Sequence, residues 1–332
     1  MDPARPPTIA DAVRCLRQGG LVAFPTETVY GLGADALNPD AVELVFQTKG
    51  RPPANPLIVH AADPEMAQTC AAEWPRDATV LADAFWPGPL TLVVPRAPNL
   101  PARVTAEGPT VALRCPDHPV ALDLIRAFGG PLVGPSANPS GDVSPTEADH
   151  VRRAFPPETV MVLDGGPCRG GIESTVVLLD GLTRKVLRPG LISAEQLAHA
   201  LHRHVEPFSP AKAALPGPLA SPGLLDRHYA PKAPAWRFSP DQWPDVLDRL
   251  LDEDGVAVVL TQSPRSLPSP HARIVMPTDA RNYAARLYAA LREADATGPA
   301  WIAVEWPPTG VESDPIWDAV GDRLRRATAP FE

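Results

Sequence analysis

Four cations in this sequence lie where α/β proteins commonly bind anions. Lys49 and Arg51, one glycine apart, follow a predicted helix and precede a proline-rich stretch that contains Asn55. Arg114 and Arg188 each end a predicted strand. Lysine at a helix end is also a structural C-cap, and a single strand-end arginine can be a surface charge. Because ligands of open α/β sheets collect at strand ends, the four cations together predict an anionic substrate.

Small hydroxyl and amide side chains form a second group. Ser136, Asn138 and Ser144 lie in a stretch rich in proline and glycine, and Ser174 follows two glycine pairs. Such loops offer hydroxyls and main-chain amides to phosphates, but the same residues are the commonest turn formers. Both interpretations stay open. The sequence has neither a Walker A nor a G-x-G-x-x-G motif, so neither standard nucleotide fold is indicated.

The histidines and cysteines do not predict a metal site. His60 ends a predicted strand, where it either contacts a ligand or caps a core strand. His199, His202 and His204 do not share one helical face, and no cysteine or carboxylate completes a ligand set. The 4 cysteines are widely spaced without a C-x-x-C pair, which predicts reduced thiols.

The elements that must position these residues alternate along the first two hundred positions. Apolar runs predict strands at 21–24, 57–59, 91–94, 110–113, 131–133, 160–163, 174–179 and 185–187. Helical spacing predicts helices from Thr8 to Leu16, from Asn38 to Phe46, and near 64–73, 118–128, 146–155 and 194–204. Because several neighbouring strands have no helix between them, the pattern predicts an α/β domain with a mixed sheet.

Regular patterning stops between Glu206 and Gly223, where prolines accumulate as in a stiff linker. Beyond this stretch, strands at 256–260, 273–276 and 301–304 alternate with helices near 241–252, 279–295 and 314–327. This order predicts a smaller, Rossmann-like layer of parallel strands. We therefore expect an α/β domain over residues 1–205, a linker over 206–231 and a C-terminal domain over 232–332.

Composition and charge exclude several classes of protein. The chain has 332 residues and a net charge of −9, and no apolar run approaches the roughly 20 residues of a membrane-spanning helix. The first residues lack the basic start and apolar stretch of a secretory signal, so we expect a cytoplasmic protein. Residues 1–205 carry 17 basic and 22 acidic side chains, so no stable nucleic-acid binding is expected.

Five ordered motifs resemble those of one family. They are Phe24 to Leu32 (FPTETVYGL), Lys49 to Leu57 (KGRPPANPL), Trp86 to Pro89 (WPGP), Pro135 to Asn138 (PSAN) and Glu173 to Val176 (ESTV). Their order and spacing resemble the threonylcarbamoyl-AMP synthase family, with its YrdC-like domain, over about residues 8–205. The later run from Arg227 to Pro231 looks like the linker of the longer, two-domain members.

The resemblance implies a YrdC-like domain with a twisted mixed sheet and flanking helices. It implies a nucleotidyltransferase reaction in which L-threonine, bicarbonate and ATP, with Mg²⁺, give threonylcarbamoyl-AMP and pyrophosphate. A partner tRNA threonylcarbamoyl transferase complex would then modify the adenosine beside the anticodon. The chemistry needs no enzyme nucleophile, because the substrates supply it. The protein has to position the reactants and stabilise phosphoryl charge.

Residue by residue, the resemblance implies two sets of ligands. The ATP-binding set is Lys49, Arg51, Asn55, Thr110, Ser136, Asn138, Ser144, Arg188 and Tyr229, with Lys49 and Arg51 catalytic. The threonine-binding set is Thr28, His60, Arg114, Gly134 and Ser174. Arg114 suits a carboxylate through a two-pronged contact. We expect the linker to close over ATP as a lid, and packing of Tyr229 in the domain interface is the alternative.

Two other functions share parts of this pattern. A carbamoyltransferase that forms carbamoyl-adenylate resembles the domain, although the zinc-finger cysteines of the hydrogenase-maturation members do not occur here. A double-stranded-RNA-binding module is disfavoured by the acidic charge of residues 1–205. A steep salt dependence of RNA binding would reveal such a module.

Overall fold

The structure is a computed structural model that describes residues 5–209, 229–307 and 314–331. The chain divides into two compact units. The N-terminal unit comprises Met1–Ser140, Ser144–Arg169 and Glu173–Leu224, and the C-terminal unit comprises Gly141–Val143, Gly170–Ile172 and Leu225–Glu332. Residues 210–228, most of the expected linker and lid, lie outside the described part of the chain.

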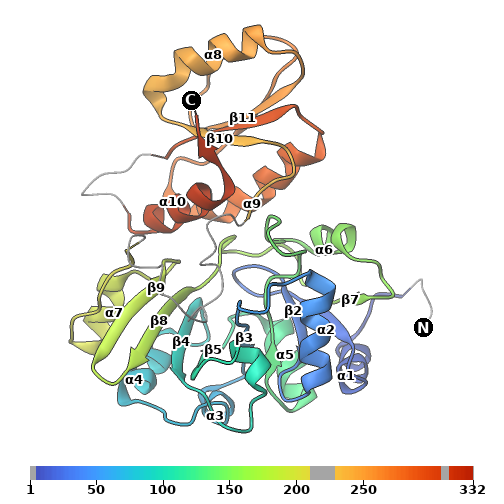
Figure 1. The fold of residues 1–332 in the computed structure, drawn as a ribbon, viewed down its shortest axis with the longest axis vertical. Helices are drawn as coiled ribbons and strands as arrows, with labels where there is room; N and C mark the ends of the chain where they lie inside the picture. Colours follow the sequence, from blue (N-terminus) through green and yellow to red (C-terminus); the bar gives the residue numbers. More distant parts are fainter. Residues whose placement is uncertain (1–4, 210–228, 308–313, 332) are drawn as a thin grey trace. The chain divides into compact units, whose positions relative to one another are not determined.

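The N-terminal unit is a mixed sheet with helices packed against it (Figure 1). Its helices are α1 (Ile9–Arg17), α2 (Pro39–Lys49), α3 (Pro64–Gln68), α4 (Arg76–Phe85), α5 (Pro119–Phe128), α6 (Ala148–Ala154) and α7 (Ala194–Leu201), with a 3-10 turn at Ala102–Thr105. Its strands are β1 (Leu21–Phe24), β2 (Gly31–Asp35), β3 (Ile58–His60), β4 (Leu90–Pro95), β5 (Thr110–Arg114), β6 (Leu132–Val133), β7 (Val160–Val162), β8 (Thr175–Asp180) and β9 (Thr183–Arg188). They form a 9-stranded sheet in the order β7-β1-β2-β6-β3-β5-β4-β8-β9.

Local capping sets where the helices begin and end. The Thr8 hydroxyl and the Asp11 carboxylate form a capping box at the start of α1. The Asn38 side chain accepts hydrogen bonds from the first amides of α2, whose first residue is a proline. Gly50 ends α2 in the left-handed conformation, at φ 58°. The chain therefore turns sharply between Lys49 and Arg51.

The central strands separate their side chains onto two faces. Side chains alternate along a strand, so Val111 and Leu113 of β5 point into the main core while Thr110, Ala112 and Arg114 point away from it. In β4, Leu90 and Leu92 likewise join that core. On the opposite face, Ile58, Val93, Ala112 and Val176 form a small apolar cluster of their own. That second face also carries the polar ends of the strands.

A β-bulge in β9 determines the face of the sheet on which Arg188 lies. The pairing of β8 with β9 shifts between Val176 and Val177, so that Val177 pairs with Val186 but Val176 pairs with Arg188. One extra residue, Leu187, lies between the two partners on β9. The bulge places Arg188 on the same face as Val176.

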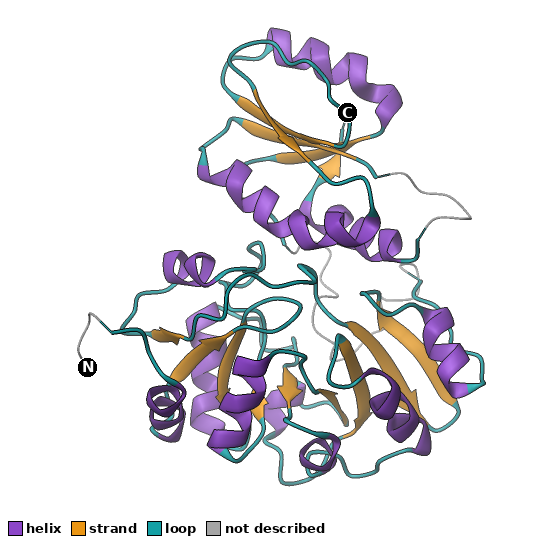
Figure 2. Ribbon diagram, turned by 180° about the vertical axis from the view of Figure 1, so that it is seen from behind, coloured by secondary structure: helices purple, strands orange, loops and turns teal. Residues whose placement is uncertain are grey.

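The C-terminal unit is a separate parallel sheet. It contains β10 (Ala235–Phe238), β11 (Ala257–Thr261), β12 (Ala272–Val275), β13 (Trp301–Glu305) and β14 (Ala329–Pro330), in the order β12-β11-β13-β10-β14. Helix α8 (Trp243–Asp252), preceded by a 3-10 turn (Pro240–Gln242), covers one face, and α9 (Ala280–Ala296) and α10 (Ile316–Ala327) cover the other (Figure 2).

The predicted fold class is confirmed in both units. The N-terminal sheet is mixed and the C-terminal sheet is parallel, as the element order predicts. The predicted helix near 64–73 ends at Gln68, and β2, α4 and β10 were not predicted. All four cysteines are free. Among the described residues, no helix is both long and apolar enough to span a membrane.

We expect Leu113→Ala to destabilise the N-terminal unit by about 2–5 kcal/mol, because Leu113 is fully buried and its loss leaves a cavity. Leu182→Ala is the matched control: Leu182 is 88% exposed, so its loss should change stability by at most about 0.5 kcal/mol. Urea unfolding, monitored by hydrogen exchange of peptides from each unit, measures both changes in stability. Equal effects would contradict the assignment of β5 to the core.

Candidate active site

The Arg114 side chain is the centre of the polar face. It is 4% exposed and ends β5 beside the end of β3, where His60 is its register partner. Its Nη2 lies 2.7 Å from Glu27 Oε1 and donates to Thr28 Oγ1 at 2.8 Å. Its Nε is buried without a hydrogen-bond partner among the described residues. The guanidinium is thus held on one nitrogen and keeps a buried donor that no described group satisfies.

The loop that supplies Glu27 and Thr28 joins β1 to β2 and is buried throughout. Thr26 Oγ1 accepts from the amides of Thr28 and Val29, both at 3.2 Å, and donates to the Val29 carbonyl. The Tyr30 hydroxyl donates to the Gly166 carbonyl at 2.9 Å and accepts from the Gly165 amide at 3.2 Å. These bonds fix the loop, so the groups that face Arg114 are held firmly.

His60 lies on this face as a neutral imidazole. Burial, reinforced by the positive charge of Arg114, lowers its pKa from 6.5 to about 3, against a weaker opposing contact with the Ile58 carbonyl. Its Nδ1 makes no well-formed hydrogen bond to a described residue. A Cβ on Gly134 would lie 2.6 Å from this nitrogen. Glycine is therefore needed at 134 for the imidazole to keep its position.

The predicted ATP and threonine sets meet at Ser174. The Arg188 guanidinium donates to the Ser174 carbonyl and hydroxyl oxygens, both at 3.1 Å. The Ser174 hydroxyl also lies 2.7 Å from the Thr91 hydroxyl. Leu92 pairs with Leu113 in the antiparallel β4–β5 ladder. Thr91, the residue before Leu92, therefore lies beside Arg114, the residue after Leu113. A residue assigned to ATP thus touches one assigned to threonine.

Lys49 and Arg51 bind main-chain carbonyls on either side of the Gly50 turn. The Lys49 ammonium donates to the carbonyls of Ser136, at 2.6 Å, and Asn138. Arg51 donates to the carbonyls of Asn55, at 2.9 Å, and Pro56, at 2.7 Å. Both cations are buried, so they organise the two loops that carry the predicted ATP ligands.

The remaining predicted residues are placed as follows. Both polar atoms of the Asn55 amide are buried without a partner among the described residues. Ser144 donates to Glu173 Oε1 at 2.7 Å. Thr110 begins β5 on the same face as Arg114, about 13 Å away at roughly 3.3 Å per residue.

Tyr229 belongs to the C-terminal unit. Its ring is buried and stacks on Tyr288 with centroids 5.4 Å apart, and the Arg323 guanidinium carbon lies 5.9 Å from the Tyr229 centroid. The expected contact of Tyr229 with ATP therefore stays a prediction.

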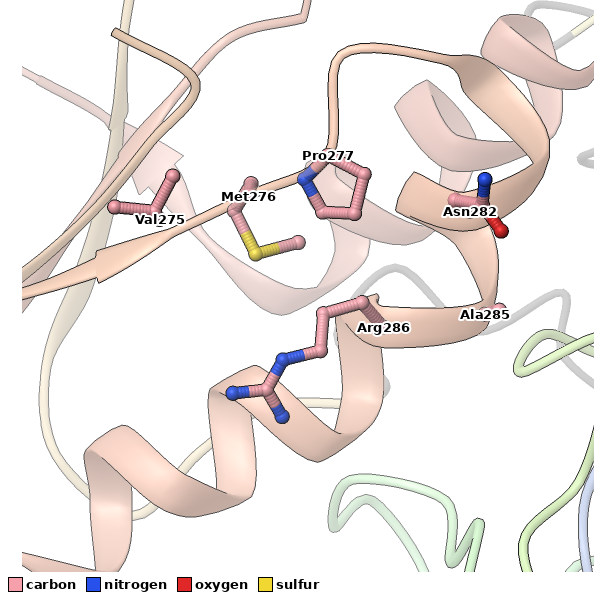
Figure 3. Close-up of a pocket in the computed structure, with 6 residues that line it drawn as sticks. All are labelled: Val275, Met276, Pro277, Asn282, Ala285 and Arg286. Carbon is pink, nitrogen blue, oxygen red and sulfur yellow. The ribbon is translucent and has the colours of Figure 1, made fainter. Parts of the chain in front are cut away.

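A pocket of about 620 Å³ in the C-terminal unit is lined by Val275, Met276, Pro277, Asn282, Ala285 and Arg286, and Figure 3 shows Met276 and Arg286 extending into the same space. Tyr229 does not line it.

Three buried residues of the site were not predicted. Glu27, Thr91 and Glu173 contact Arg114, Ser174 and Ser144, respectively. Two of them, Glu27 and Glu173, stand inside quoted motifs, directly beside Thr28 and Ser174. That adjacency was the available signal, because a carboxylate between polar ligand candidates needs a partner if it is buried. Thr91 gave no local signal beyond being the one hydroxyl in an apolar strand.

The described residues contain no group of three or more histidine, cysteine, aspartate or glutamate side chains that could hold a metal ion. What they do contain is a mixed sheet with buried arginine, histidine and hydroxyl side chains, and a buried lysine at the end of α2. The fold and these residues define a class of α/β protein with cations buried at the ends of its strands and helices.

Comparison with known proteins assigns the family. A family model described as telomere recombination matches residues 14–190, and one described as the C-terminal domain of threonylcarbamoyl-AMP synthase matches residues 192–329. A Bacillus subtilis threonylcarbamoyl-AMP synthase is 42% identical over 317 residues, covering 92% of this chain and 90% of that protein. The chain belongs to the threonylcarbamoyl-AMP synthase family.

The chain is also similar, in sequence and in structure, to proteins of Pyrococcus abyssi. A Pyrococcus abyssi threonylcarbamoyl-AMP synthase is 40% identical over 321 residues, covering 94% of this chain and 92% of that protein. The crystal structure of P. abyssi Sua5 complexed with L-threonine superposes with a TM-score of 0.88 at 36% identity, covering 98% of this chain and 96% of that one. The superposition thus spans nearly the whole of both chains.

The low pKa of His60 predicts acid sensitivity. Because the folded-state pKa of about 3 lies below the unfolded value of 6.5, the unfolded chain takes up the proton first and stability falls as pH drops below 6.5. Between pH 7 and 5, wild type should lose about 2 kcal/mol more stability than His60→Asn. Urea unfolding at both pH values measures this difference. His199→Asn, at an exposed position, should leave the wild-type pH dependence unchanged.

Proposed function

We propose that the chain is a threonylcarbamoyl-AMP synthase, which joins L-threonine, bicarbonate and ATP into threonylcarbamoyl-AMP and releases pyrophosphate and water. One observation supports this most: Arg114 Nε and both polar atoms of the Asn55 amide are buried with no hydrogen-bond partner among the described residues. Such groups are costly in a folded protein unless a ligand satisfies them. A carboxylate on Arg114 and a nucleotide on Asn55 would do so.

The proposed reaction has two bond-forming steps. The neutral amino nitrogen of threonine attacks the carbon of bicarbonate or CO₂, loses a proton and becomes a carbamate, with water leaving when bicarbonate is the donor. A carbamate oxygen then attacks the α-phosphorus of ATP, and the bond from that phosphorus to the bridging oxygen breaks to release pyrophosphate. Both nucleophiles come from the substrates. The side chains act by holding the reactants and stabilising phosphoryl charge.

The threonine end of the site is assigned to the groups around Arg114. The guanidinium would take the carboxylate in a charge-assisted contact. Thr28, His60 and Ser174 are the candidates for the substrate hydroxyl, and selection against valine needs such a polar partner, since an apolar pocket separates isosteres only about 10²-fold. The neutral state of His60 suits it to accept or donate one hydrogen bond without adding charge.

The ATP end is assigned to the loops organised by Lys49 and Arg51. Both cations, with Arg188, would offset the charge of the triphosphate, and Asn55, Thr110, Ser136, Asn138 and Ser144 would bind its polar groups. Mg²⁺ would enter with ATP and supply further phosphate neutralisation. We also propose that the product passes to a tRNA threonylcarbamoyl transferase complex, because an acyl-phosphate anhydride hydrolyses readily and is useful only to an acceptor enzyme nearby.

The direct test is incorporation of labelled bicarbonate into an adenylate. Formation of the labelled product should require both ATP and L-threonine, and pyrophosphate should appear in equal amount. Product formation without threonine would instead favour a carbamoyl-adenylate activity. The absence of any adenylate with all three substrates and Mg²⁺ present would refute the proposed function.

We expect Arg114→Gln to raise the threonine KM about 10²-fold or more, because a buried charge contact to the carboxylate is lost. The ATP KM should change by less than about threefold. Pyrophosphate release, titrated with each substrate while the other saturates, measures both constants. Arg14→Gln is the matched control, since Arg14 is an exposed arginine that pairs with Asp11 within helix α1 of the same unit, and it should leave both constants unchanged.

A further inference from the structure

We propose that Glu27 is the positioning residue of the threonine site, fixing the guanidinium of Arg114 so that its unpartnered nitrogen meets the substrate carboxylate. The inference rests on the proposed function and adds to it a residue outside the expected ligand set. Glu27 lies on the β1–β2 loop and is 5% exposed. A buried carboxylate in such a place needs a purpose that outweighs its desolvation.

The contacts of Glu27 explain how it would act. Its Oε1 lies 2.7 Å from Arg114 Nη2, and its Oε2 accepts from the Asp117 amide at 3.0 Å. Thr28 accepts from the same Nη2 at 2.8 Å. Two consecutive loop residues therefore clamp one guanidinium nitrogen, and the Asp117 contact ties the clamp to the chain just beyond β5. This leaves the Nε of Arg114 directed elsewhere and unpartnered among the described residues.

The clamp is rigid because the loop itself is fixed. Thr26 bridges the loop backbone, and Tyr30 anchors its end through the main chain of Gly165 and Gly166. A side chain on a rigid loop can orient its partner, whereas one on a mobile loop would follow it. The carboxylate also balances the charge of Arg114 while no substrate is bound, which allows the guanidinium to stay buried.

Glu27 and the substrate carboxylate are both negatively charged. Whether the removal of Glu27 strengthens or weakens threonine binding therefore distinguishes two roles for this residue. If it only neutralised Arg114, its removal would strengthen the attraction for threonine. If it positions Arg114, its removal lets the guanidinium rotate and weakens that contact. Glutamine keeps the size of the side chain, but it removes the negative charge of the ion pair with Arg114, and its amide nitrogen would face either Arg114 or the Asp117 amide, which are both donors.

The test measures threonine and ATP constants for Glu27→Gln. We expect the threonine KM to rise about tenfold with kcat at saturating threonine and the ATP KM each within about twofold. A threonine KM that falls or stays the same would overturn the proposal. Glu65→Gln, the same change at an exposed carboxylate on helix α3 of the same unit, is the control and should leave all constants unchanged.

A double-mutant cycle separates positioning from a general structural role. If Glu27 acts through Arg114, adding Glu27→Gln to Arg114→Gln should change the threonine KM by less than about twofold. Independent, multiplying effects would contradict the proposal. Threonine affinity measured by calorimetry without ATP gives the same comparison without turnover, so its outcome is distinct from failure of the proposed reaction. If Glu27→Gln does not fold, Glu27→Asp keeps the charge, shortens the side chain and serves in its place.

Discussion

The two-residue alternation of the central strands is the constraint on which the N-terminal unit depends. Val111 and Leu113 contribute to its core, and the residues between and beside them are thereby directed to the opposite face. Neighbouring strands in register bring His60 and Arg114 side by side. Burial of the apolar residues thus also determines on which face of the sheet the polar residues lie. Interactions within the site are then needed only to orient the polar side chains.

Orientation is supplied by hydrogen bonds that satisfy buried charge. Lys49 and Arg51 donate to main-chain carbonyl oxygens, so they hold two loops in place. Arg114 is itself held, by its ion pair with Glu27 and its hydrogen bond to Thr28. These buried cations therefore differ in what they orient: two position the main chain, and the third is positioned by side chains.

The sequence predicted the fold class and most strands, because apolar runs such as 110–113 are local signals. Strand β2 was not predicted, since its glycines lack side chains; Gly33 is required there because a Cβ would lie 2.9 Å from Phe24. The strand-end position of Arg114 was predicted, but its partner Glu27 was not, because pairing between distant residues leaves no local pattern. Lys49 and Arg51 were expected on a tight, proline-stiffened loop. The sequence did not predict that Lys49 would be buried, because it donates to carbonyls of a distant segment, around Ser136.

The bulge between β8 and β9 makes the length of one strand part of the chemistry. Leu187 is the added residue, so two consecutive residues of β9, Leu187 and Arg188, lie on the face of Val176. One more residue inserted after Leu187 would turn the arginine toward the core, whereas deleting Leu187 would restore regular pairing and leave the arginine opposite Val176. The hairpin should therefore tolerate the loss of this residue better than the gain of another.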